Sequence, residues 1–161
     1  MLLLDYERWG YLTTFFGEPE NLPKVVGEWL VSIGSDQEDK IYRDDLFDLF
    51  LHQVTITNAA FAIVPWLVEV CKKGETKFAI EHLTDVALVE ANRIKRGVYG
   101  NREGTEEYPE WLMADYKQAI IEARNLVNDV LEAEHDAERK YYLTAMKPAL
   151  YGNADLAEAW S

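Results

Sequence analysis

The stretch TITNAAFAIVPWLVEVCKK, from Thr55 to Lys73, decides the fold. Its apolar residues recur at helical spacing and also cover most of the remaining circumference, which is typical of a helix buried on more than one side. Thr55 is the expected N-cap, and Gly74 follows the expected last turn. The unbroken apolar run from Ala59 to Val68 is far shorter than the ~20 residues that span a membrane. The stretch therefore predicts the central core helix of an all-α protein.

Helical patterns are also present on both sides of this stretch, and residues 1–161 are expected to form a single domain. The further helices are expected at Leu2–Phe16, Leu22–Ile33, Tyr42–His52, Thr76–Arg96, Pro109–Val130 and Tyr141–Leu150. The last residues, NADLAEAWS, are expected to fold back as a cap through Leu156 and Trp160. No alternating apolar run is flanked by hairpin turn signals, so no strand is expected.

A short repeat links two of the expected helices. The segments VVGEWLVSIG and AIVPWLVEVC align Trp29 with Trp66, which lies 37 residues later. This offset is close to the ~40–47 residues of a HEAT or armadillo helix pair. In such arrays each pair buries its apolar face by stacking on the next pair. The alternative interpretation is two unrelated core helices.

Several short motifs between residues 6 and 97 also occur, in the same order, in the sequences of a known family. They are Phe16-Gly17, Glu20-Asn21-Leu22-Pro23, His52-Gln53, Thr55 and the run Ala62-Ile63-Val64-Pro65-Trp66-Leu67-Val68-Glu69. Through them the chain resembles a family of bacterial HEAT-like-repeat proteins, most of which are uncharacterised. Two residues depart from the family pattern, because Val54 replaces a glycine and Thr57 replaces an aromatic residue. The resemblance implies an α-solenoid of stacked helix pairs. Some bacterial solenoids of this kind look like immunity proteins against secreted toxins.

The charge of the chain restricts its partners. With 29 acidic and 16 basic residues, the formal net charge is −13. Nucleic acids and anionic membranes are disfavoured, since binding to either depends on Lys and Arg. A basic protein partner is favoured. The lone Cys71 is expected to be an inert packing thiol, and the N-terminus MLLLDYERWG has no cationic lead before its leucines, so a cytoplasmic location is expected.

The segment from Asp36 to Asp48 holds six acidic and two basic residues. Asp44, Asp45 and Asp48 are expected on the polar side of a helix whose other side is apolar. One interpretation is an ordinary solvated helix surface. The other is an acidic ridge that binds a basic partner.

All three histidines have acidic neighbours at helical spacing. His82 and Asp85, three residues apart, are expected to have a structural role. Asp48 and His52 are four residues apart, a spacing that suits a metal site or a base with its orienting carboxylate; the alternative is a histidine that only ends a helix. Glu132 and His135 form the Glu-x-x-His of di-iron bundles, but the second copy that such sites need is missing. Neither a metal site nor a cofactor is therefore expected.

The longest break in the helical pattern is the segment GVYGNREGTEEY, residues 97–108, and breaks of this length in a compact domain are often functional. The candidate binding residues are Asp44, Asp45, Asp48, His52, Gln53, Tyr99, Asn101 and Arg102. The sequence favours a non-enzymatic, protein-binding HEAT-like module, in its narrower form an acidic immunity or inhibitor protein that masks a basic partner. The alternative is a small-molecule-binding protein or an enzyme with a pocket near His52 and the 97–108 loop. The oligomeric state is left open.

Overall fold

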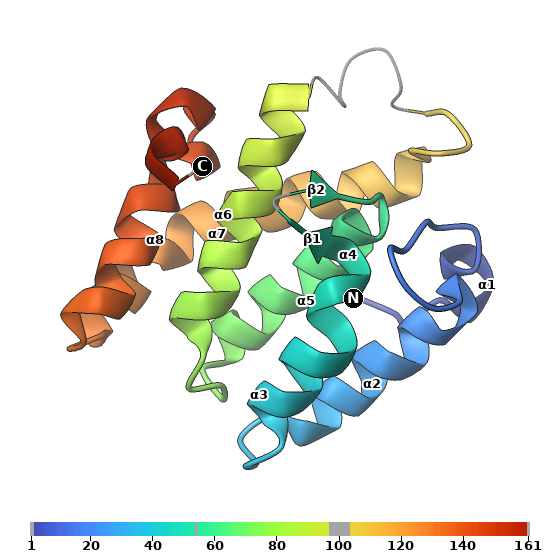
Figure 1. The fold of residues 1–161 in the computed structure, drawn as a ribbon, viewed down its shortest axis with the longest axis horizontal. Helices are drawn as coiled ribbons and strands as arrows, with labels where there is room; N and C mark the ends of the chain where they lie inside the picture. Colours follow the sequence, from blue (N-terminus) through green and yellow to red (C-terminus); the bar gives the residue numbers. More distant parts are fainter. Residues whose placement is uncertain (1, 54, 97–103, 161) are drawn as a thin grey trace.

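The computed structural model describes residues 2–53, 55–96 and 104–160, and its fold is mostly helical with one small sheet (Figure 1). In chain order the elements are α1 (Tyr6–Trp9), the 3₁₀ helix η1 (Pro19–Asn21), α2 (Leu22–Ser32), α3 (Glu38–Lys40), the π-helix η2 (Ile41–Phe47), α4 (Asp48–Phe50), β1 (Leu51–His52), β2 (Thr55–Ile56), α5 (Ala59–Lys73), α6 (Ala79–Arg96), α7 (Glu110–Ala133), α8 (Ala137–Leu150) and the 3₁₀ helix η3 (Ala154–Trp160). The predicted all-α class is confirmed apart from the sheet. None of the helices in the described ranges is long and apolar enough to cross a membrane.

Helix α5 occupies the centre of the core, as the sequence predicts. Its apolar residues are buried except for Trp66, which is half-buried. Pro65 lies inside the helix, and Gly74 ends it with a left-handed φ of 70°. The predicted start at Thr55 is wrong, because Thr55 belongs to β2 and the helix begins four residues later.

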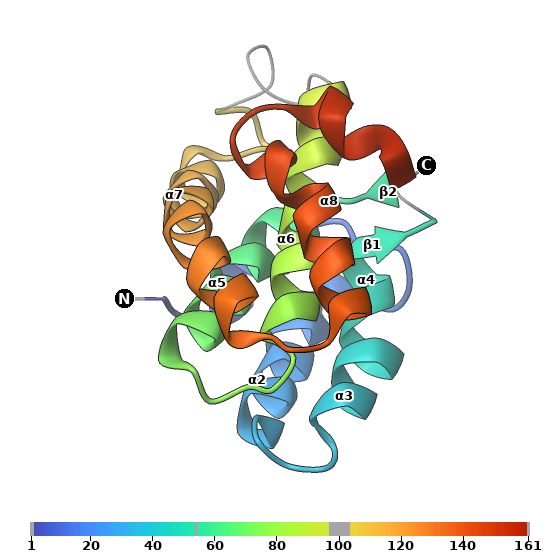
Figure 2. The ribbon, with the colours of Figure 1, turned by 90° about the vertical axis from the view of Figure 1, so that its left-hand side faces the viewer.

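The long helices form two layers around this centre. Helix α5 packs against α7 in one layer, and α6 packs against α8 in the other. The two helices of each layer are separated in sequence by one helix of the other layer. Figure 2 shows the α5–α7 layer beside the α6–α8 layer. Helix α2 packs against η2. The long helices therefore form antiparallel pairs that lie side by side.

A two-stranded antiparallel sheet contradicts the prediction that no strand is present. Leu51 pairs with Ile56, and His52 pairs with Thr55. Gln53, in the turn between them, has a φ of +48°, in the left-handed region. Each strand is only two residues long, too short to produce a period-two pattern in the sequence.

The residues that align in the short repeat do not have equal surroundings. Trp29 is fully buried, whereas Trp66 is only half-buried. Val31 is 88% exposed, whereas the aligned Val68 is 1% exposed. The valines differ because α2 buries one face, while α5 is enclosed by neighbours on most sides. Trp66 is exposed in part because it lines the hollows between α5 and α7.

The two ends of the chain also differ from the prediction. The expected helix over Leu2–Phe16 shrinks to the single turn α1. At the other end η3 packs back on α8 and α6, as expected of a cap. It does so through the buried Ala154 and Ala157, however, while Leu156 is 65% exposed; the side chain of Trp160 is outside the described part of the structure.

Candidate functional site

The acidic face, defined here as Asp44, Asp45 and Asp48, lies on η2 and the start of α4. Tyr42 and Leu46 are fully buried on the opposite side of η2, and this apolar contact turns all three carboxylates to the solvent. Among the described residues, neither Asp44 nor Asp45 has a hydrogen bond or an ion pair. These two charges are therefore available to a partner.

Two other acidic residues of the same run do not belong to this face. The Asp39 carboxylate is 3.1 Å from the Arg43 guanidinium, which neutralises it. Glu38 is fully buried. The predicted ridge of six acidic residues is therefore smaller than the sequence implies, because Glu38 points into the core and Asp39 is paired with Arg43.

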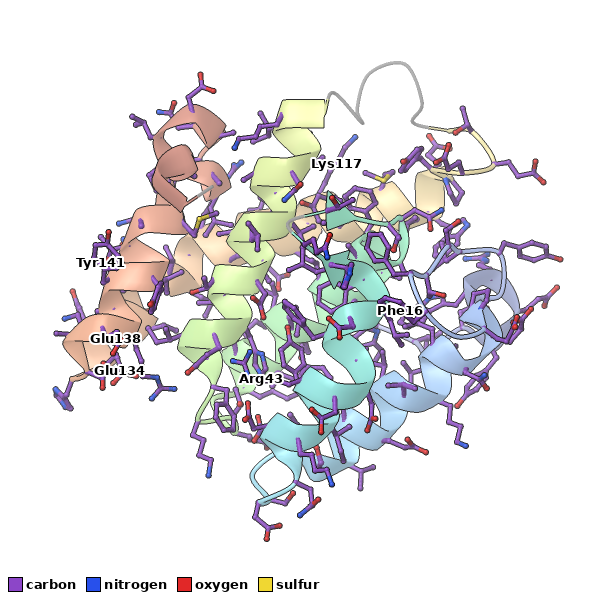
Figure 3. All side chains as sticks on the ribbon, viewed as in Figure 1. Phe16, Arg43, Lys117, Glu134, Glu138 and Tyr141 are labelled. Atoms are coloured by element: carbon purple, nitrogen blue, oxygen red, sulfur yellow. The ribbon has the colours of Figure 1, made fainter. Side chains whose placement is uncertain are left out.

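His52 borders the acidic face and is surrounded by aromatic rings. Its Nδ1 atom is 3.8 Å from the Asp48 carboxylate. The rings of Phe15 and Phe16 lie 5.8 and 5.1 Å from the imidazole, and Phe16 is 52% exposed. Figure 3 shows Phe16 beside the helical segment that carries the acidic face. An exposed aromatic ring can hold a cationic side chain, so Phe16 is a candidate site residue that the sequence analysis does not name.

The remaining candidates of the sequence are not brought together with these residues. Gln53 is exposed in the hairpin turn, and Tyr99, Asn101 and Arg102 lie outside the described residues. Tyr108, at the end of the predicted loop, is buried and its ring is 6.0 Å from that of Phe61. The predicted pocket between His52 and the 97–108 loop stays a prediction.

A buried polar cluster lies directly behind the acidic face. The Glu38 carboxylate accepts hydrogen bonds from the Gly34 amide, at 2.8 Å, and from the Thr76 hydroxyl, and it lies 3.8 Å from His82 Nε2. Burial acts to raise the pKa of Glu38, but the nearby His82 ring and these two donors outweigh burial and lower it. The cluster thus holds a carboxylate in the core.

The His82 ring stands edge-on to Trp29 and Tyr42, with ring centroids 5.4 and 4.6 Å away. Neither of its nitrogens has a hydrogen bond within the described residues. The Tyr42 hydroxyl donates to Asp85 Oδ2 at 2.7 Å. Tyr42 therefore links the buried cluster to a carboxylate nearer the surface.

Asp85 opens into a groove of about 320 Å³ between η2, α6 and α8. Figure 3 shows Arg43 and Glu138, which also line it, on either side of the first turns of α6. Burial raises the pKa of Asp85 to about 6, although the hydrogen bond from Tyr42 and the charges of His82 and Arg43 oppose the rise. We refer to this cavity as the Asp85 groove.

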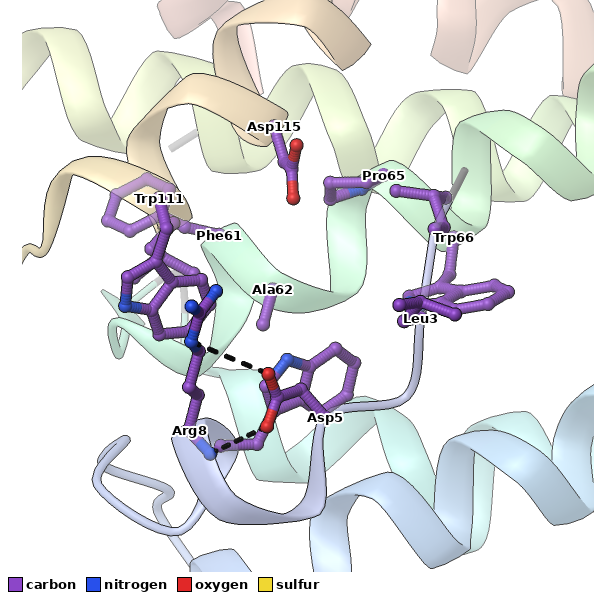
Figure 4. Close-up of a pocket in the computed structure, with 12 residues that line it drawn as sticks. Leu3, Asp5, Arg8, Phe61, Ala62, Pro65, Trp66, Trp111 and Asp115 are labelled. Atoms are coloured by element: carbon purple, nitrogen blue, oxygen red, sulfur yellow. Dashed lines mark hydrogen bonds and ion pairs between the residues drawn. The ribbon is translucent and has the colours of Figure 1, made fainter.

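A second groove follows the contact between α5 and α7 (Figure 4). Two adjoining hollows of about 200 and 440 Å³ share Trp66 and Asp115 in their walls. In the smaller one Arg8 lies over the Trp111 ring, 5.4 Å from its centroid, and forms an ion pair with Asp5 at 3.5 Å. The chain's own arginine thus already occupies the cation site on Trp111.

Comparison of the chain with protein-family models, with curated proteins and with solved structures gives no match.

Proposed function

We propose that this protein is a non-enzymatic binding module that holds a basic protein partner on its acidic face. The observation that carries the proposal is the pair Asp44 and Asp45, exposed and without an ion pair among the described residues, in a chain of net charge −13. A negative surface attracts a positive one and raises the rate of encounter.

The aromatic border of the acidic face adds contacts that charge alone does not supply. A single exposed ion pair contributes only about 0–1 kcal/mol, so three carboxylates give a weak interface by themselves. Phe16 offers an apolar ring surface and a cation–π site beside His52, whose Nδ1 atom is 3.8 Å from the Asp48 carboxylate. Aromatic residues of this kind are enriched at interface hot spots.

The arrangement of helices supports the solenoid part of the proposal. The helix pairs α2–η2, α5–α6 and α7–α8 follow one another, with α5 on α7 and α6 on α8. Stacked pairs of this kind present extended faces to partners. The narrower form of the proposal is a cytoplasmic inhibitor of the immunity type that masks a basic toxin; a toxin gene beside the gene for this protein would support it.

The alternative, an enzyme or small-molecule binder near His52, has less support. Within the described residues, the imidazole contacts Phe15, Phe16 and Asp48, and neither the Asp85 groove nor the α5–α7 groove is lined by His52. A catalytic histidine is expected to face a cavity that admits substrate.

Affinity capture with three baits tests the proposal. The baits are the wild type, the triple variant Asp44→Asn, Asp45→Asn, Asp48→Asn, and a control with the same charge change at exposed positions elsewhere, Glu75→Gln, Asp129→Asn, Glu132→Gln. We expect a basic protein to be retained by the wild type and the control and lost from the acidic-face variant. Its association rate with the wild type should fall as salt is added, because screening acts over ~10 Å at 0.1 M. Equal recovery by all three baits would contradict the proposal.

A further inference from the structure

We propose that the Asp85 groove is the anchor pocket for a lysine side chain of the basic partner. This inference rests on the proposed function and adds to it a defined ligand chemistry. The groove lies on the side of η2 that carries Arg43, next to the acidic face, so one partner surface can reach both.

The charges in the groove leave a carboxylate without a counter-ion. Arg43 is paired with Asp39 at 3.1 Å, and Arg139 is paired with Glu81 at 2.7 Å and Glu134 at 3.2 Å. Both guanidiniums that line the groove therefore already take part in ion pairs with other carboxylates. Asp85 forms no ion pair within the described residues, and it accepts a hydrogen bond from the neutral Tyr42 hydroxyl.

The geometry favours an ammonium over a guanidinium. One carboxylate oxygen of Asp85, Oδ2, already accepts from Tyr42, so fewer lone-pair sites remain for the two parallel bonds that arginine makes with a carboxylate. A lysine ammonium is a compact point charge that needs a single acceptor oxygen. Its methylene stem needs apolar walls, and Ile80 and the Tyr142 ring line the groove.

The environment of Asp85 also supports a cationic occupant. Burial holds the pKa of this carboxylate near 6, which means that its charged form is poorly stabilised in the free protein. An ammonium beside it would stabilise that form. Glu138 at the rim adds a second negative charge along the same path, without an ion pair in the described residues.

NMR titration with Nα-acetyl-lysine methylamide, which keeps the charged ε-ammonium, tests this pocket directly. We expect backbone amide shifts in residues 80–85 and 138–142, with millimolar affinity. N-acetyl-norleucine methylamide has the same chain without the charge and should leave these amides unchanged. N-acetyl-arginine methylamide should bind more weakly than the lysine probe; equal binding would overturn the preference for lysine.

Two variants and a control complete the experiment. Asp85→Asn keeps an oxygen for the Tyr42 hydroxyl but removes the charge, and it should weaken lysine binding by about fivefold or more, the equivalent of one ion pair. Glu138→Gln, an exposed change that leaves the core intact, should weaken it to a smaller extent. Asp129→Asn, an exposed charge change on α7 outside both the groove and the acidic face, should have no effect.

The two proposals fail separately in these experiments. If the lysine probe perturbs the groove no more than the norleucine probe, or if Asp85→Asn binds it as the wild type does, the anchor pocket is wrong while the acidic face can still bind a partner. If the lysine probe binds as expected but no basic protein depends on the acidic face in affinity capture, the groove stands and the proposed function is wrong.

Discussion

Trp29 and Trp66 show how far local sequence determines the surroundings of one residue. Both are followed by Leu-Val in apolar helices, and the sequence predicts Trp66 in the core. The structure buries Trp29 fully, between α2, η2 and α6, and leaves Trp66 half-buried beside the α5–α7 groove. Helical periodicity gives the face on which a residue lies, but what covers that face depends on distant segments.

Trp29→Ala should destabilise the protein by about 3–5 kcal/mol, the range for removing a buried aromatic side chain. Trp66→Ala should cost clearly less, because its ring is already in part exposed. Trp29→Phe is the matched control, since it keeps a ring against Tyr42 and His82 and removes an indole N–H that has no acceptor within the described residues. Urea denaturation measures all three. An equal loss for Trp29→Ala and Trp66→Ala would contradict this ranking.

Asp85 should make stability fall as the pH rises from about 4 to about 6. Burial raises its pKa from the ordinary 3.8 to about 6 in the folded state, with Tyr42, His82, Arg43 and Glu81 as its charged or titratable neighbours. Between these two pH values the folded state binds more protons than the unfolded state, so each step up in pH favours unfolding.

Asp85→Asn removes this titration and should flatten that part of the curve. Above pH 6 the variant should be at least as stable as the wild type, because it no longer holds a partly buried charge. Urea midpoints of both proteins between pH 4 and pH 7 provide the comparison. Parallel curves across the whole range would show that Asp85 keeps an ordinary pKa.

At the scale of elements, the strongly periodic helices are predictable and the short elements are not. Helices α5, α6 and α7 follow from apolar residues at helical spacing with clear ends such as Gly74 and Pro109. The two-residue strands have no pattern of their own, and the π-helix η2 looks like any amphipathic helix in the sequence. Glu38 is the case with most effect on the site: a charge run is ordinarily solvated, and only Thr76 and His82, about 40 residues later, make its burial possible.

The cap η3 should depend on Ala157 and not on its neighbour Leu156. Ala157 is 3% exposed and Leu156 is 65% exposed. Ala157→Glu forces a carboxylate against α8 and α6 and should cost more than about 2 kcal/mol, whereas Leu156→Glu should change stability by no more than about 0.5 kcal/mol. Thermal and urea unfolding of the two variants test the pair. If Leu156→Glu were the more damaging change, the cap would pack through the face that the sequence predicted.

At the scale of the whole molecule, the sequence predicts the all-α class and the sign of the surface charge. It does not predict where that charge is concentrated, because burial of Glu38 and pairing of Asp39 with Arg43 decide which carboxylates remain free. The groove beside Asp85 also depends on three elements that are distant in sequence, so no local pattern contains it.

A net charge of −13 should make the folded protein more stable when salt is added. Self-repulsion disfavours the compact state, and ions screen it over ~10 Å at 0.1 M. We expect the melting temperature to rise between 10 mM and 300 mM NaCl, by less in the variant with three neutralised carboxylates on the acidic face. A falling melting temperature would mean that ion pairs such as Arg139–Glu81 dominate.

The seven-residue π-helix η2 has wider turns than an α-helix, so it contains more backbone than an α-helix would need between its two buried residues. Tyr42 and Leu46 are buried, and the three residues between them are exposed. Residues three apart share a face of an α-helix just as residues four apart do. Deleting Asp44 would therefore leave both buried residues on the core side, while the wide i→i+5 turns close to ordinary i→i+4 turns. In an ordinary α-helix, a one-residue deletion rotates all following side chains by about 100°. In η2 we expect the deletion to convert the π-helix to an α-helix without moving the residues that follow it. Unchanged NMR shifts of His82 and Asp85 in the deletion variant would confirm this prediction.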